Sequence, residues 1–256
     1  MNPLEMNRVL GYVNENMVDF HQRRIKSIEG LELGKLLTKN PYLFKAKNIT
    51  TAEELILGLL EAFLSSSEEK LFGDFLEGLA IFTAELTCGG YKSSAPGVDL
   101  EFIDGGVHYV VSVKSGPSWG NSSQQSRLEQ DLKNAVTRVK QSKRGVNIQP
   151  VLGICYGKSK TSYVRGYMKV VGQNFWYLIS GNQHLYTDII EPIGYRTQEY
   201  NESFLTEKDM VVGRFAQQFA DRFCNRSNGS IDWTKLVEAN SGNFDLDKFL
   251  RGKDAA

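Results

Sequence analysis

The sequence predicts an α/β (α+β) protein in which helices flank a mixed β-sheet and a helical region comes first. Three observations predict this class. Apolar side chains recur at helical intervals over the first 88 residues, residues 98–114 alternate around a glycine turn, and the following segments read as helix, strand, strand and helices. We expect a helical N-terminal region over residues 1–88 and a sheet-containing core with C-terminal helices over residues 89–256.

The overall composition excludes several classes of protein. The 256 residues carry 30 basic and 30 acidic side chains, and 41% are hydrophobic, which suits a globular core rather than a disordered tail. No apolar run approaches the roughly 18 residues of a membrane span, and the N-terminus is too polar for a signal peptide. Cys88, Cys155 and Cys224 form no CxxC pair, so we expect a reducing, cytoplasmic setting without disulfides.

The zero net charge hides a strong separation along the chain. Residues 50–111 hold 2 basic and 11 acidic side chains, whereas residues 112–170 hold 11 basic and 2 acidic ones, so the net charges are −9 and +9. Such blocks can mix again in the fold, or they can form a polyanion-facing surface beside an acidic one that holds cations. Both interpretations stay open at this point.

The N-terminal region is predicted to form three main helices. Residues 4–30 have apolar positions at helical spacing, and Pro41 breaks the pattern because a proline pushes its predecessor out of the helical conformation. Thr51–Glu54 is a capping box that opens the second helix. The serines at 65–67 are expected to start a third helix, over residues 68–86.

A β-hairpin is predicted next. Val98–Ile103 alternates as a strand does, Asp104–Gly106 forms the turn, and Val107–Lys114 is the returning strand. The hairpin marks the change from helical to strand periodicity.

The rest of the chain completes the sheet and its helical layers. Residues 123–142 combine a buried apolar stripe with a basic face, and Val151–Tyr156 is typical of a buried central strand. The other expected elements are a strand over residues 163–171, short helices over 175–179 and 186–190, and an amphipathic helix over 206–226.

The hairpin is expected to bring a carboxylate close to a lysine. With the turn centred near Gly105, Asp99 would lie across from about Val111, and Ser112 and Lys114 would share one face. Such a pair suits metal-dependent phosphodiester hydrolysis: the aspartate binds a hard cation, and the lysine orients water or stabilises charge on the phosphate. An Asp–Lys pair across a hairpin is, however, more often a plain surface salt bridge.

The hairpin resembles the PD-(D/E)xK nuclease superfamily. The matching residues are Gly97–Asp99 and Val111–Lys114, with 15 residues from the aspartate to the lysine. Ser112 stands where the family usually has Asp or Glu, and a serine is a poor replacement for a metal-binding carboxylate. The resemblance implies that the preceding helix supplies an acid. Glu77 is the first choice, and Asp74, Glu85 and Glu101 are the alternatives.

Longer segments resemble type II restriction endonucleases. They are Lys39–Asn48, Lys114–Gln124 and Phe175–Ile193, which span most of residues 39–195. The resemblance implies a restriction-endonuclease-like fold and a Mg²⁺-dependent homodimer that hydrolyses both strands of a short palindromic double-stranded DNA site. It also implies a cognate DNA methyltransferase that protects the host. Residues 1–88 would serve in dimerisation, clamp the DNA and supply the metal-site acid.

The same resemblance assigns roles to single residues. Asp99 and Glu77 would bind Mg²⁺, and Lys114 and Ser112 would complete the catalytic site. Lysines and arginines would neutralise phosphates, and the amide- and hydroxyl-rich loop after Lys114 would contact bases. The expected DNA-binding residues are Lys45, Lys47, Ser118, Trp119, Asn121, Ser122, Ser123, Gln124, Gln125, Lys133, Arg138, Lys140, Lys158 and Lys160, with Lys143, Arg144 and Arg165 as further phosphate contacts.

Two alternative functions stay open. Ser112 in the place of a carboxylate motivates a sequence-specific DNA-binding protein that does not cleave. A nuclease of repair or transposition would recognise the structure of DNA rather than its sequence. Cleavage mapping separates these alternatives, since each predicts a different product.

Overall fold

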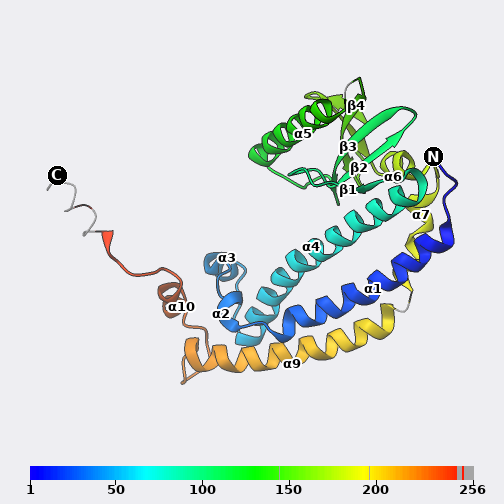
Figure 1. Ribbon diagram of the computed structural model, residues 1–256. Helices are drawn as coiled ribbons and strands as arrows, with labels where there is room; N and C mark the ends of the chain where they lie inside the picture. Colours follow the sequence, from blue (N-terminus) through cyan, green and yellow to red (C-terminus); the bar gives the residue numbers. More distant parts are fainter. Residues whose placement is uncertain (144, 196, 247–249, 251–256) are drawn as a thin grey trace. The chain divides into compact units, whose positions relative to one another are not determined.

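The chain contains a mixed β-sheet, as the sequence predicts, and it has six strands (Figure 1). The computed structural model describes residues 1–143, 145–195, 197–246 and 250. The strands lie in the order β1-β2-β3-β4-β6-β5, and β3, β4 and β6 run parallel while the other neighbours are antiparallel. Their bounds are Tyr91–Lys92 (β1), Leu100–Asp104 (β2), Val107–Lys114 (β3), Asn147–Ile154 (β4), Ser162–Val164 (β5) and Tyr167–Val171 (β6).

The chain divides into two compact units, each built from separate stretches of sequence. The sheet unit comprises Met1–Arg23 and Glu68–Asn201, and the helical unit comprises Arg24–Ser67 and Glu202–Ala256. This division differs from the expected boundary between residues 88 and 89. The physical reason is that the helices α1 (Met6–Glu29) and α4 (Ala52–Cys88) each contribute residues to both units.

Helices cover both faces of the sheet in the sheet unit. Helix α5 (Ser122–Ser142) packs its apolar stripe against one face, which includes Val110. The C-terminal half of α4, the first part of α1 and helix α6 (Gln173–Ser180) pack on the other face, which includes Val111. Neighbouring strand residues point to opposite faces, so both faces of β3 are buried. The short helices α7 (Leu185–Asp188) and α8 (Ile190–Gly194) follow α6.

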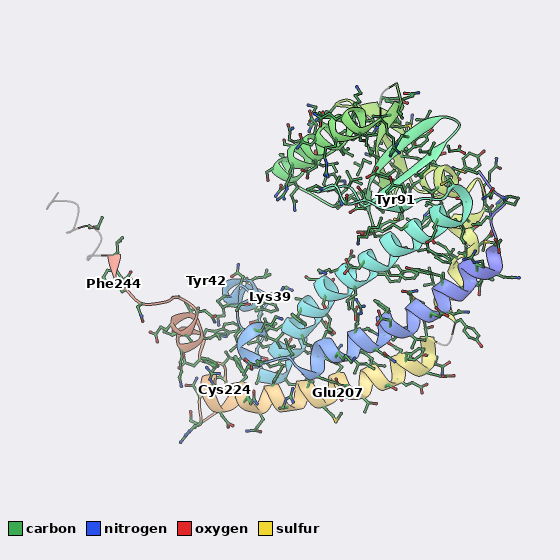
Figure 2. The ribbon with its side chains drawn as sticks, in the orientation of Figure 1. Lys39, Tyr42, Tyr91, Glu207, Cys224 and Phe244 are labelled. Atoms are coloured by element: carbon green, nitrogen blue, oxygen red, sulfur yellow. The ribbon has the colours of Figure 1, made fainter. Side chains whose placement is uncertain are left out.

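The helical unit has an apolar core of its own. It joins the N-terminal half of α4 to most of α9 (Thr197–Phe223), whose phenylalanines recur at helical spacing, and to α2 (Leu33–Leu36), α3 (Pro41–Ala46) and α10 (Trp233–Ala239). Asn40 caps α3 by accepting hydrogen bonds from the main-chain nitrogens of Tyr42 and Leu43. Tyr42 is exposed on this helix (Figure 2). None of the helices in the described part of the chain combines the length and the apolarity needed to cross a bilayer.

The prediction of a helix start at residues 65–67 is wrong. Helix α4 runs without interruption from Ala52 to Cys88. The serines stay inside it because their hydroxyls can return to the helix's own carbonyls, as Ser66 Oγ does to Ala62 O at 3.2 Å. The predicted capping residue does open this helix: Thr51 Oγ1 accepts the main-chain hydrogen bond of Glu54 at 3.2 Å.

Two turns differ from the prediction because pairs of residues with positive φ form two-residue loops. In the first hairpin Gly105 and Gly106 alone form the loop, both with positive φ, so Leu100 pairs with Val111 and the register lies one residue from the expected one. Continuing this register places Asp99 opposite Ser112. Residues 163–171 form a second hairpin, β5–β6, rather than one strand, because Arg165 and Gly166 both adopt positive φ.

Gly153 of β4 supports a prediction about stability. A Cβ atom at this position would overlap the ring of the buried Phe175. We expect Gly153→Ala to destabilise the protein by about 1–3 kcal/mol in thermal or urea unfolding, because the core must shift. The matched control is Gly213→Ala in α9, where nothing lies within 4 Å of the added atom. Unchanged or raised stability for Gly153→Ala would contradict this packing.

Candidate active site

Asp99 lies just before β2 and is held by hydrogen bonds to the neighbouring strand β3. Its main-chain nitrogen donates to Val111 O at 2.9 Å. Its Oδ2 atom accepts a hydrogen bond from Val113 N at 2.6 Å and from Ser112 Oγ at 3.3 Å. Every hydrogen bond that the described residues make to this carboxylate uses Oδ2, so Oδ1 is available to a ligand.

Lys114 meets Asp99 across the hairpin. Its Nζ lies 3.7 Å from Asp99 Oδ2 and donates to Val113 O at 2.9 Å. The expected proximity of the aspartate and the lysine is therefore confirmed. The ammonium thus faces a carboxylate oxygen and a main-chain carbonyl oxygen.

Glu77 comes from α4 and shares the electrostatic environment of this pair. Burial raises the pKa of its carboxyl group, the negative charge of Asp99 raises it further, and the charges of Lys92 and Lys114 act in the opposite direction. Its side chain is 29% exposed, and Oε1 lies 3.6 Å from Lys92 Nζ. Glu77 on α4 thus lies within electrostatic range of Asp99, just before β2, and of Lys114, at the end of β3.

The three alternative acids have other surroundings. Asp74 is exposed and pairs with Lys70 one turn away on α4, at 3.1 Å, and Glu85 is exposed. Glu101 is buried in a network in which Ser93, His108 and Tyr91 hydrogen-bond to its carboxylate. Burial opposes the ionisation of Glu101, but these hydrogen bonds outweigh it and lower its pKa.

The edge strand β1 takes part in the Glu101 network. Tyr91, which follows the C-terminal end of α4 (Figure 2), donates to Glu101 Oε2 at 3.2 Å, and Ser93 Oγ donates to Oε1 at 2.5 Å. His108 Nε2 lies 2.9 Å from Oε2. Glu101 therefore ties β1 to the hairpin and has little free capacity to bind a ligand, which leaves Glu77 as the best-placed acid.

The oxygen atoms at this site fit a divalent cation. Two carboxylates, the Ser112 hydroxyl and the Val113 carbonyl are hard donors of the kind that Mg²⁺ takes, and the like charges of Glu77 and Asp99 are relieved by a cation. Within the described residues no three His, Cys, Asp or Glu side chains gather as a metal-binding group. A metal here would therefore depend on the hydroxyl, the carbonyl and water as well as on the two acids.

Cys155 lies beside the site without the properties of a nucleophile. Its main-chain nitrogen donates to Lys114 O at 2.9 Å. Burial, together with the charge of Glu77, raises the pKa of its thiol to about 12, so it stays protonated at neutral pH. It borders a cavity of about 610 Å³ that Leu76, Tyr156 and Trp176 also line.

The loop after Lys114 uses most of its polar groups to begin α5. Asn121 caps the helix and forms a reciprocal capping box with Gln124, and Ser123 Oγ donates to Asn121 Oδ1 at 2.7 Å. Gln125 donates to Gly120 O at 3.2 Å. Trp119 packs on the apolar cluster under α5, with Lys114 Nζ 6.0 Å from its ring centroid. Ser118 and Ser122 are the other residues of this loop that the sequence analysis expects to contact DNA.

The fold separates the expected phosphate contacts into two groups. Lys158 and Lys160 lie in the loop after β4, and the carboxyl ends of the parallel strands β3 and β4 share the sheet edge where Lys114 lies. Arg138 and Lys140 lie near the other end of α5, roughly 25 Å along its axis from Asn121. All four are exposed and form no ion pair with the described residues. Lys133, also on α5, pairs with Glu129 at 2.7 Å, and Arg144 lies outside the described residues.

Lys45 and Lys47 belong to the helical unit. Their Nζ atoms lie over the rings of Trp233 and Phe44, at 5.4 Å and 5.2 Å from the centroids. These contacts leave both ammonium groups partly exposed, since a ring covers only one side of a cation.

Lys92 lies beside the candidate site and is absent from the residues that the sequence predicts for it. It lies on β1, which is too short to show a strand pattern. The sequence does contain a signal that singles out Lys92: Lys70 and Lys92 are the two basic residues in the acidic stretch 50–111. Of these, Lys92 pairs with Glu77, the acid whose pKa the charge of Asp99 raises.

Comparison with known proteins identifies the family. A search of curated proteins finds no match. The family model for type II restriction endonuclease EcoO109I matches residues 7–201, which include the whole sheet, α4 and the Asp99–Lys114 hairpin. The chain therefore belongs to the type II restriction endonuclease EcoO109I family and is a site-specific deoxyribonuclease that acts on double-stranded DNA.

Proposed function

We propose that the protein is a Mg²⁺-dependent type II restriction enzyme that hydrolyses both strands of a short palindromic site at Asp99, Glu77 and Lys114. The observation that carries this proposal is the Asp99–Lys114 pair on the hairpin, with the Glu77 carboxylate of α4 close enough for the charges of both residues to act on it. The family match supports DNA hydrolysis, and the geometry supports the location.

Each residue has a role that follows from its contacts. Asp99 and Glu77 would hold the Mg²⁺, which when bound polarises the scissile phosphate and acidifies water. Ser112 and the Val113 amide hold the Asp99 carboxylate in place through Oδ2. Lys114, at the end of β3, would orient the attacking water and stabilise the negative charge that develops on the phosphate. The products would carry 5′-phosphate and 3′-hydroxyl ends.

A homodimer accounts for cleavage of both strands. Each chain has one such cluster, and a palindrome presents two equivalent scissile bonds, which a two-fold pair of chains matches. In this proposal the helical region over residues 1–88 takes part in dimerisation and in clamping the DNA, besides supplying Glu77. A cognate DNA methyltransferase would protect the host genome in the cytoplasm.

Digestion of plasmid DNA tests the proposal. We expect discrete fragments with Mg²⁺, no product with EDTA, and restored cleavage when Mg²⁺ is added in excess. Ends mapped to one palindromic sequence would support the restriction activity. Specific binding without any nick in Mg²⁺ or Mn²⁺ would show instead a DNA-binding protein without cleavage, as the serine at position 112 allows. Cuts that follow branches or DNA ends would indicate a structure-specific nuclease.

The lysines after β4 should contribute most to phosphate binding. We expect Lys158→Ala and Lys160→Ala each to weaken DNA binding and to reduce the slope of log K against log salt by roughly one, because each removes one phosphate contact. Lys140→Ala, at the far end of α5, removes the same charge and should change the slope less. Equal effects of all three variants would show that DNA also runs along α5.

A further inference from the structure

We propose that Lys92 is a positioning residue that holds Glu77 in the free enzyme and transfers to a DNA phosphate when substrate binds. This inference rests on the proposed function, since it requires Glu77 to be a metal-site acid. It adds a second lysine to the site, with a role different from that of Lys114.

The position of Lys92 carries the first part of the argument. Lys92 lies on the edge strand β1, where its Cα pairs with Leu100, the residue after Asp99. Its Nζ lies 3.6 Å from Glu77 Oε1. The two carboxylates of the site thus each face a lysine, Asp99 facing Lys114 and Glu77 facing Lys92.

The two lysines differ in how firmly they are held. Lys114 is 30% exposed and its ammonium donates to a main-chain carbonyl as well as facing Asp99. Lys92 is 73% exposed, and among the described residues its ammonium forms an ion pair with Glu77 alone. An ion pair so open to water is weak, because the solvent screens it and the long side chain loses freedom when it forms. Lys92 can therefore exchange partners at small cost, whereas Lys114 is fixed.

The charges give the exchange a direction. An ammonium at Glu77 repels a divalent cation and occupies an oxygen that the cation needs. A DNA phosphate near the site offers Lys92 another anion. When Lys92 moves to this phosphate, the Glu77 carboxylate becomes free to bind the cation. Metal and DNA should then bind cooperatively, because each favours the arrangement that the other needs.

Binding of Mn²⁺ to the free protein, followed by electron paramagnetic resonance, tests the inference without cleavage. We expect Lys92→Ala to bind Mn²⁺ about threefold to tenfold more tightly than the wild type, since a positive charge is removed from the site. Lys70→Ala is the matched control, because Lys70 is equally exposed on α4 and pairs with Asp74. It should leave Mn²⁺ binding unchanged.

The second part of the inference is that Lys92 transfers to a DNA phosphate. It is tested by measuring, without metal, the binding of a DNA fragment that the wild type cuts once. We expect Lys92→Ala to lower the salt slope by roughly one and Lys92→Arg to retain it. The ratio of Mn²⁺ affinities with and without this DNA should be smaller for Lys92→Ala than for the wild type.

The outcomes separate this inference from the proposed function. If Glu77→Gln weakens Mn²⁺ binding but Lys92→Ala leaves it unchanged, the acid is correct and the role of Lys92 is refuted. If Glu77→Gln leaves Mn²⁺ binding unchanged, the metal-site acid itself is misplaced. Tighter binding by Lys70→Ala alone would move the site to Asp74 and overturn both.

Discussion

Asp99→Asn and Lys114→Ala are each expected to reduce single-turnover DNA cleavage by at least about 10³-fold while leaving the protein folded. Asparagine keeps the shape of the aspartate but loses the charge that would hold Mg²⁺. Lys114→Ala removes the ammonium that lies 3.7 Å from Asp99 Oδ2. The measurement is the rate of cleavage of a single-site DNA with enzyme in excess, at saturating Mg²⁺.

The controls for this first prediction come from α4. Asp74→Asn and Lys70→Ala remove the same charges from an exposed ion pair one turn before Glu77, and they should cleave within about threefold of the wild type. Circular dichroism and thermal unfolding confirm that each variant is folded. Cleavage by Asp99→Asn or Lys114→Ala at the rate of the controls would place the active site elsewhere.

Glu77→Gln is expected to lower cleavage by roughly 10²-fold or more and, without metal, to raise the melting temperature. The pKa of Glu77 is raised in the folded protein by burial and by the charge of Asp99. A raised carboxyl pKa means that ionisation disfavours the folded state at neutral pH, so the neutral glutamine removes this penalty. The gain should shrink as the pH falls, because Glu77 itself then becomes neutral.

Ser112→Ala tests whether Glu77 on α4, rather than the residue at position 112, takes the role of the acid that the family usually has at position 112. The Ser112 hydroxyl makes one hydrogen bond of 3.3 Å to Asp99, so we expect only about tenfold slower cleavage. A larger loss for Ser112→Ala than for Glu77→Gln would contradict the assignment of Glu77. A Glu77→Gln variant that is inactive but less stable would show that its role is structural.

The fold was predictable where the sequence pattern is long and regular. The apolar stripe of α5 and the alternation around Gly105 and Gly106 predict a helix and a hairpin that the structure contains. The pattern does not fix the turn, because a one-residue change in loop length shifts the register of the whole pair. The serines at 65–67 misled the prediction, since their hydroxyls are satisfied inside a helix as well as at its start.

The candidate site was predictable only in part, for a related reason. Asp99 and Lys114 belong to one hairpin, so their proximity follows from local pairing. Glu77 reaches them through the packing of α4 on the sheet, and Lys92 through a two-residue edge strand. Neither placement is encoded in local periodicity. Asn121 and Gln124 show a different limit of sequence-based prediction. A polar loop whose composition suggests base contacts also forms a helix cap.

Iron-dependent cleavage of the protein itself tests the central claim, that Glu77 and Asp99 bind the catalytic cation. Fe²⁺ in place of Mg²⁺, with ascorbate and hydrogen peroxide, cuts the polypeptide next to the bound ion, and the new ends are mapped by mass spectrometry. We predict cuts within a few residues of Glu77, Asp99 and Val113 in the wild type, suppressed by excess Mg²⁺ and absent from Asp99→Asn. Cuts confined to other segments, or the same cuts in Asp99→Asn, would contradict the claim.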